Sequence, residues 1–148
     1  MTDYRVLVTG SRDWQDRKMV FDALDAVLAE VAWAAKEAGE PWTLTVVHGQ
    51  CPSGADWMAR RWYWSRSRLW HGHVYEDPHP ADWARLGKGA GNARNQVMVD
   101  KGANRCLAFW WAEAANAGTA DCTARAEAAG IPVTRFYGGQ EKAPPPEW

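Results

Sequence analysis

The chain has 148 residues, of which 47% are hydrophobic and 24% are charged. This length and composition predict one domain with a single hydrophobic core and leave too little chain for a second one. The formal net charge of -1 argues against a protein that mainly coats the nucleic-acid backbone, because that role requires a clear excess of cationic side chains.

Cysteine usage and hydropathy indicate the compartment. The three cysteines, Cys51, Cys106 and Cys122, are widely spaced and form neither a Cys-x-x-Cys pair nor a zinc-ligand pattern. The chain enters its first predicted strand without a charged and apolar leader, and no apolar run approaches the roughly 20 residues that span a bilayer. We therefore expect a reduced, cytoplasmic protein with no membrane partner.

The first predicted unit is a strand, a glycine loop and a helix, over residues 4–8, 9–14 and about 20–31. Gly10, Ser11 and Arg12 are candidate ligand-binding residues. The glycine lets a ligand approach the backbone, the hydroxyl donates a hydrogen bond, and the guanidinium can grip a phosphate or carboxylate in two places. The alternative is that Ser11 or Asp13 only caps the helix.

The second unit repeats this order, with a buried strand ending at Val47, a loop over residues 49–56 and an amphipathic helix. Such a junction points backbone N–H groups and the positive end of a helix dipole at one place, which suits a phosphate. The candidate ligand-binding residues are Gly49, Gly54, Ala55 and Asp56. Gly54 would permit close approach, and Asp56 could bind a ribose hydroxyl or the loop's own amides. The alternative is a tight turn capped by Asp56.

Two features of the following segment favour structural roles. A cluster of arginines and aromatic residues could bind and stack on nucleic acid, but the charge balance favours a solvated helix face beside a packed one. Its members are Arg60, Arg61, Trp62, Tyr63, Trp64, Arg66, Arg68 and Trp70. The histidines His71, His73 and His79 lie in a predicted strand and turn without a carboxylate pattern, so we predict no metal site.

The chain contains 11 tryptophans, and several lie close to the candidate loops. We expect most of them to fill the core or its rim. An aromatic ring beside a phosphate-binding loop could instead stack on a base. The tryptophans near the loops are Trp57, Trp62, Trp64, Trp70, Trp83, Trp110 and Trp111.

Residues 87–99 predict a flexible, glycine-rich loop that turns into a helix with Arg94 and Asn95 in its first turns. A cation at a helix N-terminus opposes the helix dipole, and a bound anion would remove that conflict. Arg94 is therefore the strongest single ligand-binding candidate. The alternative is an exposed arginine without a function.

The third unit begins with a strand over residues 105–109 and leads through a loop to Gly118, Thr119 and an alanine-rich helix over residues 121–129. Thr119 could bind a phosphate or could simply cap that helix. Three strand-loop-helix units in succession predict a parallel sheet with helices on its faces. Ligands of such sheets bind beyond the carboxyl ends of the strands, where all three loops lie.

Four ordered motifs together resemble the YspA/cpYpsA-related SLOG family. They cover residues 6–13, 46–56, 82–98 and 118–121, the last followed by residues 130–133. The resemblance implies an α/β fold, a Rossmann-like three-layer sandwich with a mainly parallel sheet of about five strands. It also implies a nucleotide or nucleotide-derived ligand and a homo-oligomer. We assign residues 1–137 to this SLOG-like domain and residues 138–148 to a Pro-rich C-terminal tail.

The resemblance also places the ligand site residue by residue. The implied ligand-binding residues are Gly10, Ser11, Arg12, Gly49, Gly54, Ala55, Asp56, Arg94, Asn95, Gly118 and Thr119. Related phosphoribohydrolases carry Pro-Gly-Gly-x-Gly-Thr-x-x-Glu at the last turn, and the final Glu is catalytic. In this chain Asn116 and Ala117 precede Gly118, and Cys122 stands at the position of that Glu.

The sequence therefore supports three hypotheses of different classes. The first is a protein that senses or sequesters a nucleotide-derived ligand, such as an ADP-ribose-like or cyclic-nucleotide signal, without a cofactor or metal. The alternative is an N-glycosidase, a phosphoribohydrolase acting on nucleoside monophosphates, in which Asp121 or otherwise Asp56 would be the catalytic carboxylate. A weaker alternative is binding of single-stranded nucleic acid, which the charge balance makes an improbable partner.

Overall fold

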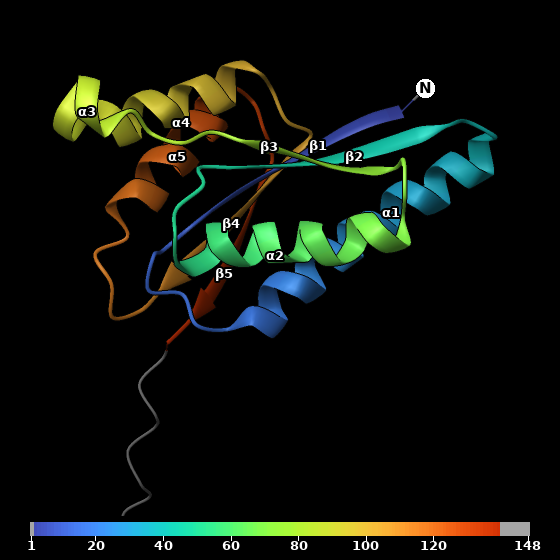
Figure 1. Ribbon diagram of the computed structural model, residues 1–148, viewed down its shortest axis with the longest axis horizontal. Coiled ribbons are helices and arrows are strands. Elements are labelled where there is room, and N and C mark those ends of the chain that lie inside the picture. Colours follow the sequence, from blue (N-terminus) through green and yellow to red (C-terminus); the bar gives the residue numbers. More distant parts are fainter. Residues whose placement is uncertain (1, 140–148) are drawn as a thin grey trace, which may run out of the picture.

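The computed structural model describes residues 2–139 and forms a five-stranded sheet covered by helices on both faces (Figure 1). The strands are β1 (Thr2–Gly10), β2 (Trp42–His48), β3 (Val74–Pro78), β4 (Arg105–Trp111) and β5 (Val133–Gly138). Their order is β3-β2-β1-β4-β5, and all neighbouring strands are parallel. The predicted Rossmann-like fold with five strands is confirmed, and the sheet is parallel throughout.

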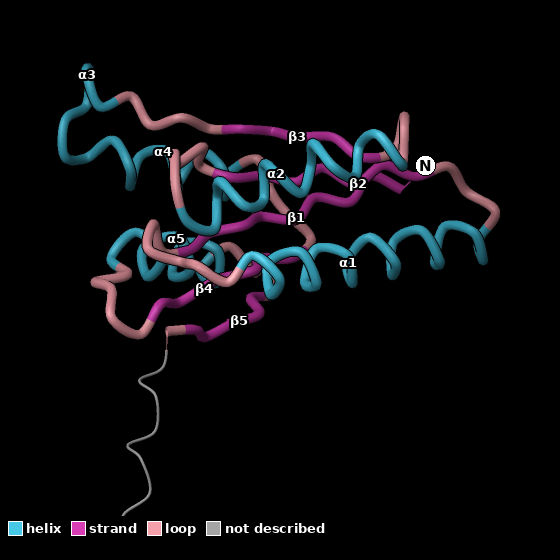
Figure 2. The backbone as a smooth tube through the Cα atoms, turned by 60° about the horizontal axis from the view of Figure 1, so that its bottom comes forward, coloured by secondary structure: helices cyan, strands magenta, loops and turns pink. Residues whose placement is uncertain are grey.

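Helices α1 (Arg17–Ala38) and α2 (Gly54–Leu69) lie on one face of the sheet, and α4 (Ala90–Asp100) and α5 (Ala117–Ala128) lie on the other (Figure 2). Each face has its own buried apolar cluster. On β1, Val6 and Val8 belong to the α1/α2 cluster, whereas Leu7 belongs to the α4/α5 cluster. This alternation is expected of a strand that is covered on both faces.

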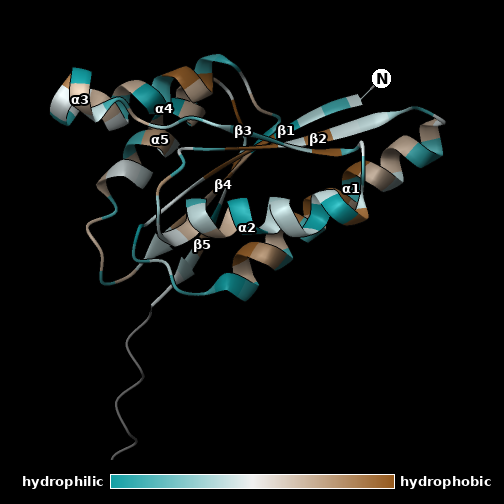
Figure 3. Cartoon of the chain, viewed as in Figure 1, coloured by the Kyte–Doolittle hydropathy of each residue, from teal (hydrophilic) through white to brown (hydrophobic). Residues whose placement is uncertain are grey.

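Helix α1 begins at a side-chain cap that the sequence analysis did not identify. The Asp16 side chain accepts a hydrogen bond from the Met19 amide, so neither Ser11 nor Asp13 caps this helix. The helix ends at Gly39, which has a φ of 67° and supplies a left-handed C-cap. The predicted periodicity is confirmed, and Figure 3 shows hydrophobic residues alternating with polar ones along α1.

Three members of the arginine and aromatic cluster on α2 contact carboxylates of neighbouring elements. Arg66 makes two hydrogen bonds to Asp25 of α1, and the Trp62 indole donates a third to the same carboxylate. Arg60 lies 3.4 Å from Glu76. These contacts join α2 to its neighbours, and they favour the structural explanation of the cluster over a nucleic-acid surface.

Edge strand β3 is fastened to β1 and α4 through Asp77. The Asp77 carboxylate lies 2.8 Å from Arg5, 3.1 Å from His79 and 3.2 Å from Lys101. Burial alone would raise the pKa of Asp77, but these cationic and hydrogen-bonding partners outweigh it and hold the pKa well below its usual range. His79 thus contacts a carboxylate of the fold, and His73 stacks on Trp42.

The segment between β3 and α4 differs from the predicted flexible loop. It contains a short helix α3 (Trp83–Leu86) and one 3-10 turn (Gly87–Gly89), and α4 then begins at Ala90. Asp82 caps α3 by accepting from the Arg85 amide. The glycines of this segment permit tight successive turns, with Gly87 at a φ of 56°, rather than an open loop.

The strand order creates a switch point between β1 and β4. The chain runs outward from β1 through β2 to β3 and then crosses to β4 and β5 on the other side of β1. The helices that follow β1 and β4 therefore leave toward opposite faces, and a crevice opens at the carboxyl ends of these strands.

Two other sequence expectations concern the ends and the surface of the domain. The predicted tail over residues 138–148 starts at Gly138, which ends β5 and accepts a hydrogen bond from the Ala112 amide. Residues 140–148 lie outside the described part of the chain. Among the helices of residues 2–139, none is long and apolar enough to cross a membrane.

Candidate functional site

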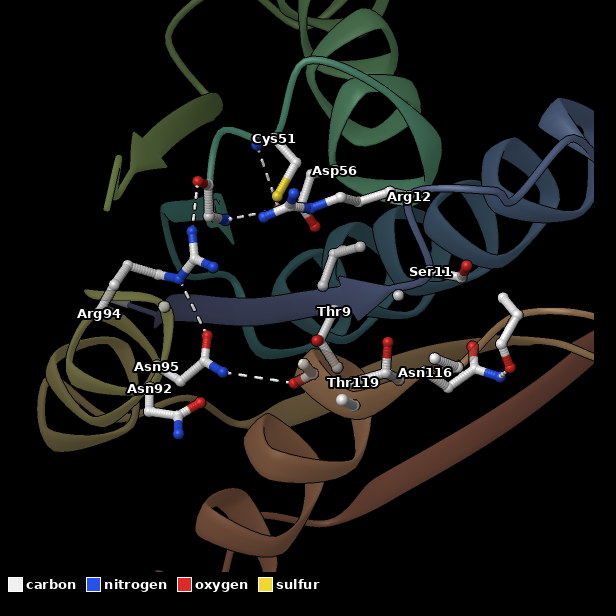
Figure 4. Close-up of a pocket in the computed structure, with 18 of the residues that line it drawn as sticks. Thr9, Ser11, Arg12, Cys51, Asp56, Asn92, Arg94, Asn95, Asn116 and Thr119 are labelled. Carbon is white, nitrogen blue, oxygen red and sulfur yellow. Dashed lines mark hydrogen bonds between the residues drawn. The ribbon is translucent and has the colours of Figure 1, made fainter. Parts of the chain in front are cut away.

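A cavity of about 350 Å³ opens at the switch point, between the loops that follow β1, β2 and β4 and the start of α4 (Figure 4). Most of the predicted ligand-binding residues meet there. Those that line it are Gly10, Ser11, Arg12, Gly49, Asp56, Arg94, Asn95, Gly118 and Thr119. Gly54, Ala55 and Asp121 are not part of the lining.

The loop after β1 is held against α2 and β4 by close packing. A Cβ atom added to Gly10 would lie 2.5 Å from the Cβ of Ala55, so this glycine and this alanine let the loop and the helix approach each other. The Ser11 amide donates to the carbonyl of Phe109, and the Ser11 hydroxyl accepts from the amide of Asp13. Ala55 therefore supports the cavity wall from behind.

Gly54 serves the same packing. It has a φ of 74°, and the amide of the next residue, Ala55, donates to the carbonyl of Ser11. A Cβ atom at Gly54 would lie 2.2 Å from that carbonyl oxygen. The structure shows a packing requirement at Gly54, the contact between the first and second loops. The approach of a ligand to the Gly54 backbone stays a prediction.

Asp56 organises the second loop. Its buried carboxylate accepts hydrogen bonds from the amides of Gly49 at 3.1 Å and Cys51 at 3.4 Å. Of the two partners considered for Asp56, the structure therefore shows the loop's own amides. A carboxylate that accepts from two amides holds the loop in a fixed conformation beside the cavity.

His48 supports the same loop from the core. Its Nδ1 accepts a hydrogen bond from the amide of Gln50, so the ring proton resides on Nε2, which lies 3.0 Å from Glu76. Gln50 has a φ of 54°, a conformation uncommon for residues with side chains. The buried imidazole and its carboxylate partner therefore stabilise a strained turn at the edge of the cavity.

Arg94 crosses from α4 to the second loop. Its Nη1 donates to the carbonyl of Gly49 at 2.6 Å and to that of His79 at 3.4 Å, and its Nε donates to the side chain of Asn95 (Figure 4). A Cβ atom at Gly49 would lie 2.2 Å from Arg94 Nη1, so a side chain at this position would displace the guanidinium from its present place.

Arg94 does not lie at a helix N-terminus, where the sequence pattern had placed it. Arg94 is the fifth residue of α4, and a 3-10 turn precedes that helix, so the guanidinium does not lie at an unprotected helix start. The carbonyls of Gly49 and His79 accept hydrogen bonds from the guanidinium and so partly stabilise its charge. Its place in the cavity wall keeps it a candidate anion ligand on geometric grounds.

Asn95 and Asp121 form a bridge between α4 and α5. The Asn95 amide donates to the Gly118 carbonyl at 3.3 Å and to the Asp121 carboxylate at 3.0 Å, and Arg125 donates to the same carboxylate oxygen. Burial opposes ionisation of Asp121, but the hydrogen bonds from Arg125 and Asn95 lower its pKa. Asp121 is thus an ion-paired carboxylate behind the cavity wall, and the catalytic role considered for it finds no geometric support.

The N-terminus of α5 opens into the cavity without a side-chain cap. The N-cap residue Asn116 is left-handed, and its side chain bonds to the backbone of Trp111 and Ala114 instead. Gly118 and Thr119 follow in the first turn, so Thr119 is not the cap of this helix. The free amides of this turn carry the positive end of the helix dipole.

The Thr119 side chain adds a hydroxyl to that turn. Thr119 is only 2% exposed and lines the cavity, and no hydrogen bond of its hydroxyl is found within residues 2–139. A buried hydroxyl that faces a cavity can donate to an anion held by the neighbouring amides.

Comparisons with known proteins identify relatives of this chain. The sequence profile described as "YspA, cpYpsA-related SLOG family" matches residues 4–86, more than half of the chain. The chain belongs to this family. It is also 44% identical over 132 residues to the Gene 61 protein of Mycobacterium phage D29, an overlap that covers 89% of this chain and 95% of the phage protein. No solved structure gives a significant match.

The family match covers β1 through α3 and therefore includes the first two loops of the cavity. Arg94 and the α5 turn lie beyond residue 86, and their place in this SLOG domain rests on the geometry described above. The predicted family is confirmed, whereas the residues of its ligand site stay predictions.

Burial raises the pKa of the cysteine thiols of this SLOG domain. Burial, with a contribution from Asp56, raises the pKa of the Cys51 thiol in the cavity wall, although Arg94 and Arg12 oppose the shift. Burial also raises the pKa of Cys122 to about 11. Because the thiolate is the reactive form, neither residue has the character of a nucleophile at neutral pH.

Several lining residues were not among the predicted ligand-binding residues. They include Thr9, Lys88, Asn92 and Asn116. Trp83 also lines the cavity, and the sequence analysis considered it only as one of several tryptophans that could stack on a base. Thr9 could have been found, because it is the last side chain before the glycine that ends the first strand. Lys88 and Asn92 reach the cavity only because the turns after α3 fold back over it, and no local pattern predicts that path.

Proposed function

We propose that this SLOG domain binds a nucleotide-derived small molecule, such as an ADP-ribose-like or cyclic-nucleotide signal, as a sensor or a sequestering protein. One observation supports the proposal most strongly. At the switch point of the sheet, the uncapped N-terminus of α5 shares a single cavity with the guanidinium groups of Arg12 and Arg94. Free amides and two cations around one cavity are suited to a phosphate or pyrophosphate.

The proposal is tested by identifying what the protein carries. We expect mass spectrometry of small molecules released from the purified, denatured protein to detect a nucleotide or nucleotide derivative. The same preparation of the Arg94→Ala variant is expected to carry less of it, because one of the two cavity guanidiniums is removed. Absence of any nucleotide, together with no calorimetric binding of nucleoside phosphates or ADP-ribose, would contradict the proposal.

The N-glycosidase alternative receives less support from the site. Cleavage through an oxocarbenium-like transition state needs a carboxylate near the sugar. Asp121 is ion-paired with Arg125 outside the cavity lining, and Asp56 accepts hydrogen bonds from two loop amides. Single-stranded nucleic acid is likewise less supported, because Arg60 and Arg66 are paired with carboxylates of the fold.

We therefore expect slow or absent release of free base when the protein is incubated with nucleoside monophosphates and ADP-ribose. Chromatography of the products measures this directly. Rapid release that disappears in Asp56→Asn, with the variant still folded, would overturn the binding-protein proposal. Rapid release of free base that disappears in Asp121→Asn would also overturn the binding-protein proposal, and it would place the Asp121 carboxylate in the reaction.

A further inference from the structure

Trp83 is a large aromatic residue at the rim of the cavity. It begins α3, a four-residue helix without a buried side chain, and it remains 50% exposed while lining the cavity. Exposure of a single apolar residue is ordinary on protein surfaces. The Trp83 ring, however, lies close to Gly91 and to the guanidinium of Arg12.

The ring lies over the start of α4. A Cβ atom added to Gly91 would lie 3.4 Å from Trp83 Cη2, so the far edge of the indole rests close to the backbone of α4. Asp82 and Arg85 stabilise the short helix through a capping hydrogen bond and an ion pair. The indole is therefore supported at its edge while half of its surface stays accessible.

Arg12, from the loop after β1, lies over the same ring. The guanidinium carbon is 5.7 Å from the ring centroid. No hydrogen bond or ion pair of the Arg12 side chain is found within residues 2–139, and its contact with the Trp83 ring is a cation-π contact. The Arg12 side chain can therefore move without breaking a hydrogen bond or an ion pair of the described residues.

These dimensions are close to those of a stacking site. Stacked planar groups are separated by about 3.5–4.0 Å, so a planar ring between an indole and a guanidinium needs about 7 Å or slightly more. The distance of 5.7 Å from the Arg12 guanidinium carbon to the Trp83 ring centroid is shorter than this, so Arg12 must move outward by more than about 1 Å to admit a base. Indole and guanidinium planes are the side-chain surfaces on which bases stack.

We propose that Trp83 is the platform on which the aromatic base of the ligand stacks, with Arg12 covering the opposite face of that base. This inference rests on the proposed function and extends it. Trp83 selects ligands that carry a base over phosphorylated sugars that lack one. Stacking on a π-face is tolerant of base identity, so the platform defines the class of ligand and not the particular base.

The test compares probes with and without a base. AMP, GMP, CMP and UMP are titrated by calorimetry beside ribose 5-phosphate, which carries the same sugar and phosphate alone. In the unmodified protein, at least one nucleotide is expected to bind about fivefold or more tighter than ribose 5-phosphate. The Trp83→Leu variant is expected to lose about fivefold or more of that nucleotide affinity and to bind ribose 5-phosphate as before.

Two variants control for the aromatic surface and for tryptophan content. Trp83→Phe keeps a ring and is expected to retain most of the nucleotide affinity. Trp33, on α1, is 64% exposed, and Trp33→Leu is expected to leave both affinities unchanged. Thermal unfolding of each variant reports on folding, and α3 contributes no buried side chain whose loss would unfold the domain.

The outcomes separate the two proposals. Equal loss of nucleotide and ribose 5-phosphate binding in Trp83→Leu, or no loss of either, would overturn the stacking role while phosphate binding stands. Equal affinities of the unmodified protein for the nucleotides and for ribose 5-phosphate would also overturn the stacking role. Failure of the unmodified protein to bind any of these probes would overturn the stacking role. The proposed function is overturned as well if ADP-ribose also fails to bind and the denatured protein releases no nucleotide.

Discussion

Gly54→Ala is expected to destabilise the protein by about 2–4 kcal/mol. A left-handed conformation at φ 74° costs a residue with a side chain about 1 kcal/mol. The added Cβ atom would lie 2.2 Å from the Ser11 carbonyl oxygen and 2.6 Å from the Arg12 Cα, and relieving such overpacking costs about 1–3 kcal/mol more. Urea or thermal denaturation of the two proteins measures the difference.

Gly39→Ala is the matched control for this prediction. Gly39 has a φ of 67°, close to that of Gly54, but nothing lies within 4 Å of its added Cβ atom. Only the backbone cost applies there, so the expected loss is about 1 kcal/mol. Equal losses in the two variants would show that the contact between the first and second loops contributes nothing.

A loss of ligand binding in Gly54→Ala would follow from the same displacement. The substitution separates the loop after β1 from the start of α2, and both loops line the cavity. Binding data on this variant therefore report on the shape of the cavity and do not assign Gly54 to the ligand. The glycine pattern had instead suggested that the ligand approaches the backbone of Gly54 directly.

Arg94→Ala is expected to weaken binding of AMP by about tenfold to a hundredfold. Loss of a hydrogen bond from a charged group to the phosphate costs about 1.5–3 kcal/mol. The variant also loses the hydrogen bonds to Gly49 and Asn95, so a smaller loss of stability accompanies the loss of binding. Calorimetry and thermal unfolding measure the two effects separately.

Adenosine distinguishes contact with phosphate from support of the loop. Adenosine has no phosphate, so Arg94→Ala is expected to weaken AMP binding much more than adenosine binding. Arg61→Ala, at an exposed arginine of α2, is the matched control and is expected to change neither affinity. Equal weakening of AMP and adenosine would restrict Arg94 to holding the second loop, and unchanged AMP affinity in the folded variant would remove it from the site.

The strand-loop-helix order was predictable because it depends on neighbours along the chain. The apolar run around Val6 and Val8, the helical spacing of Val20, Leu24 and Val27, and the glycines after the strands predict the elements without knowledge of their partners. Parallel strands end at the same edge of a sheet, so this order also brought most of the candidate loops to one cavity.

The roles of individual residues were less predictable because they depend on partners distant in sequence. Arg94 donates to the carbonyl of Gly49, 45 residues away, and Gly54 is required by the carbonyl of Ser11. The sequence shows which residue types are present at each loop. It does not show which carbonyl or carboxylate will stand opposite them.

Sequence alone thus determined the family, the parallel α/β fold and the edge of the sheet where a ligand site would form. Only the tertiary structure decided that Asp121 pairs with Arg125 behind the wall, that Asp56 holds the loop amides, and that Trp83 meets Arg12 at the rim. The physical reason is that periodicity reports burial and local conformation, whereas the direction of a polar side chain depends on where the folded chain places its acceptor.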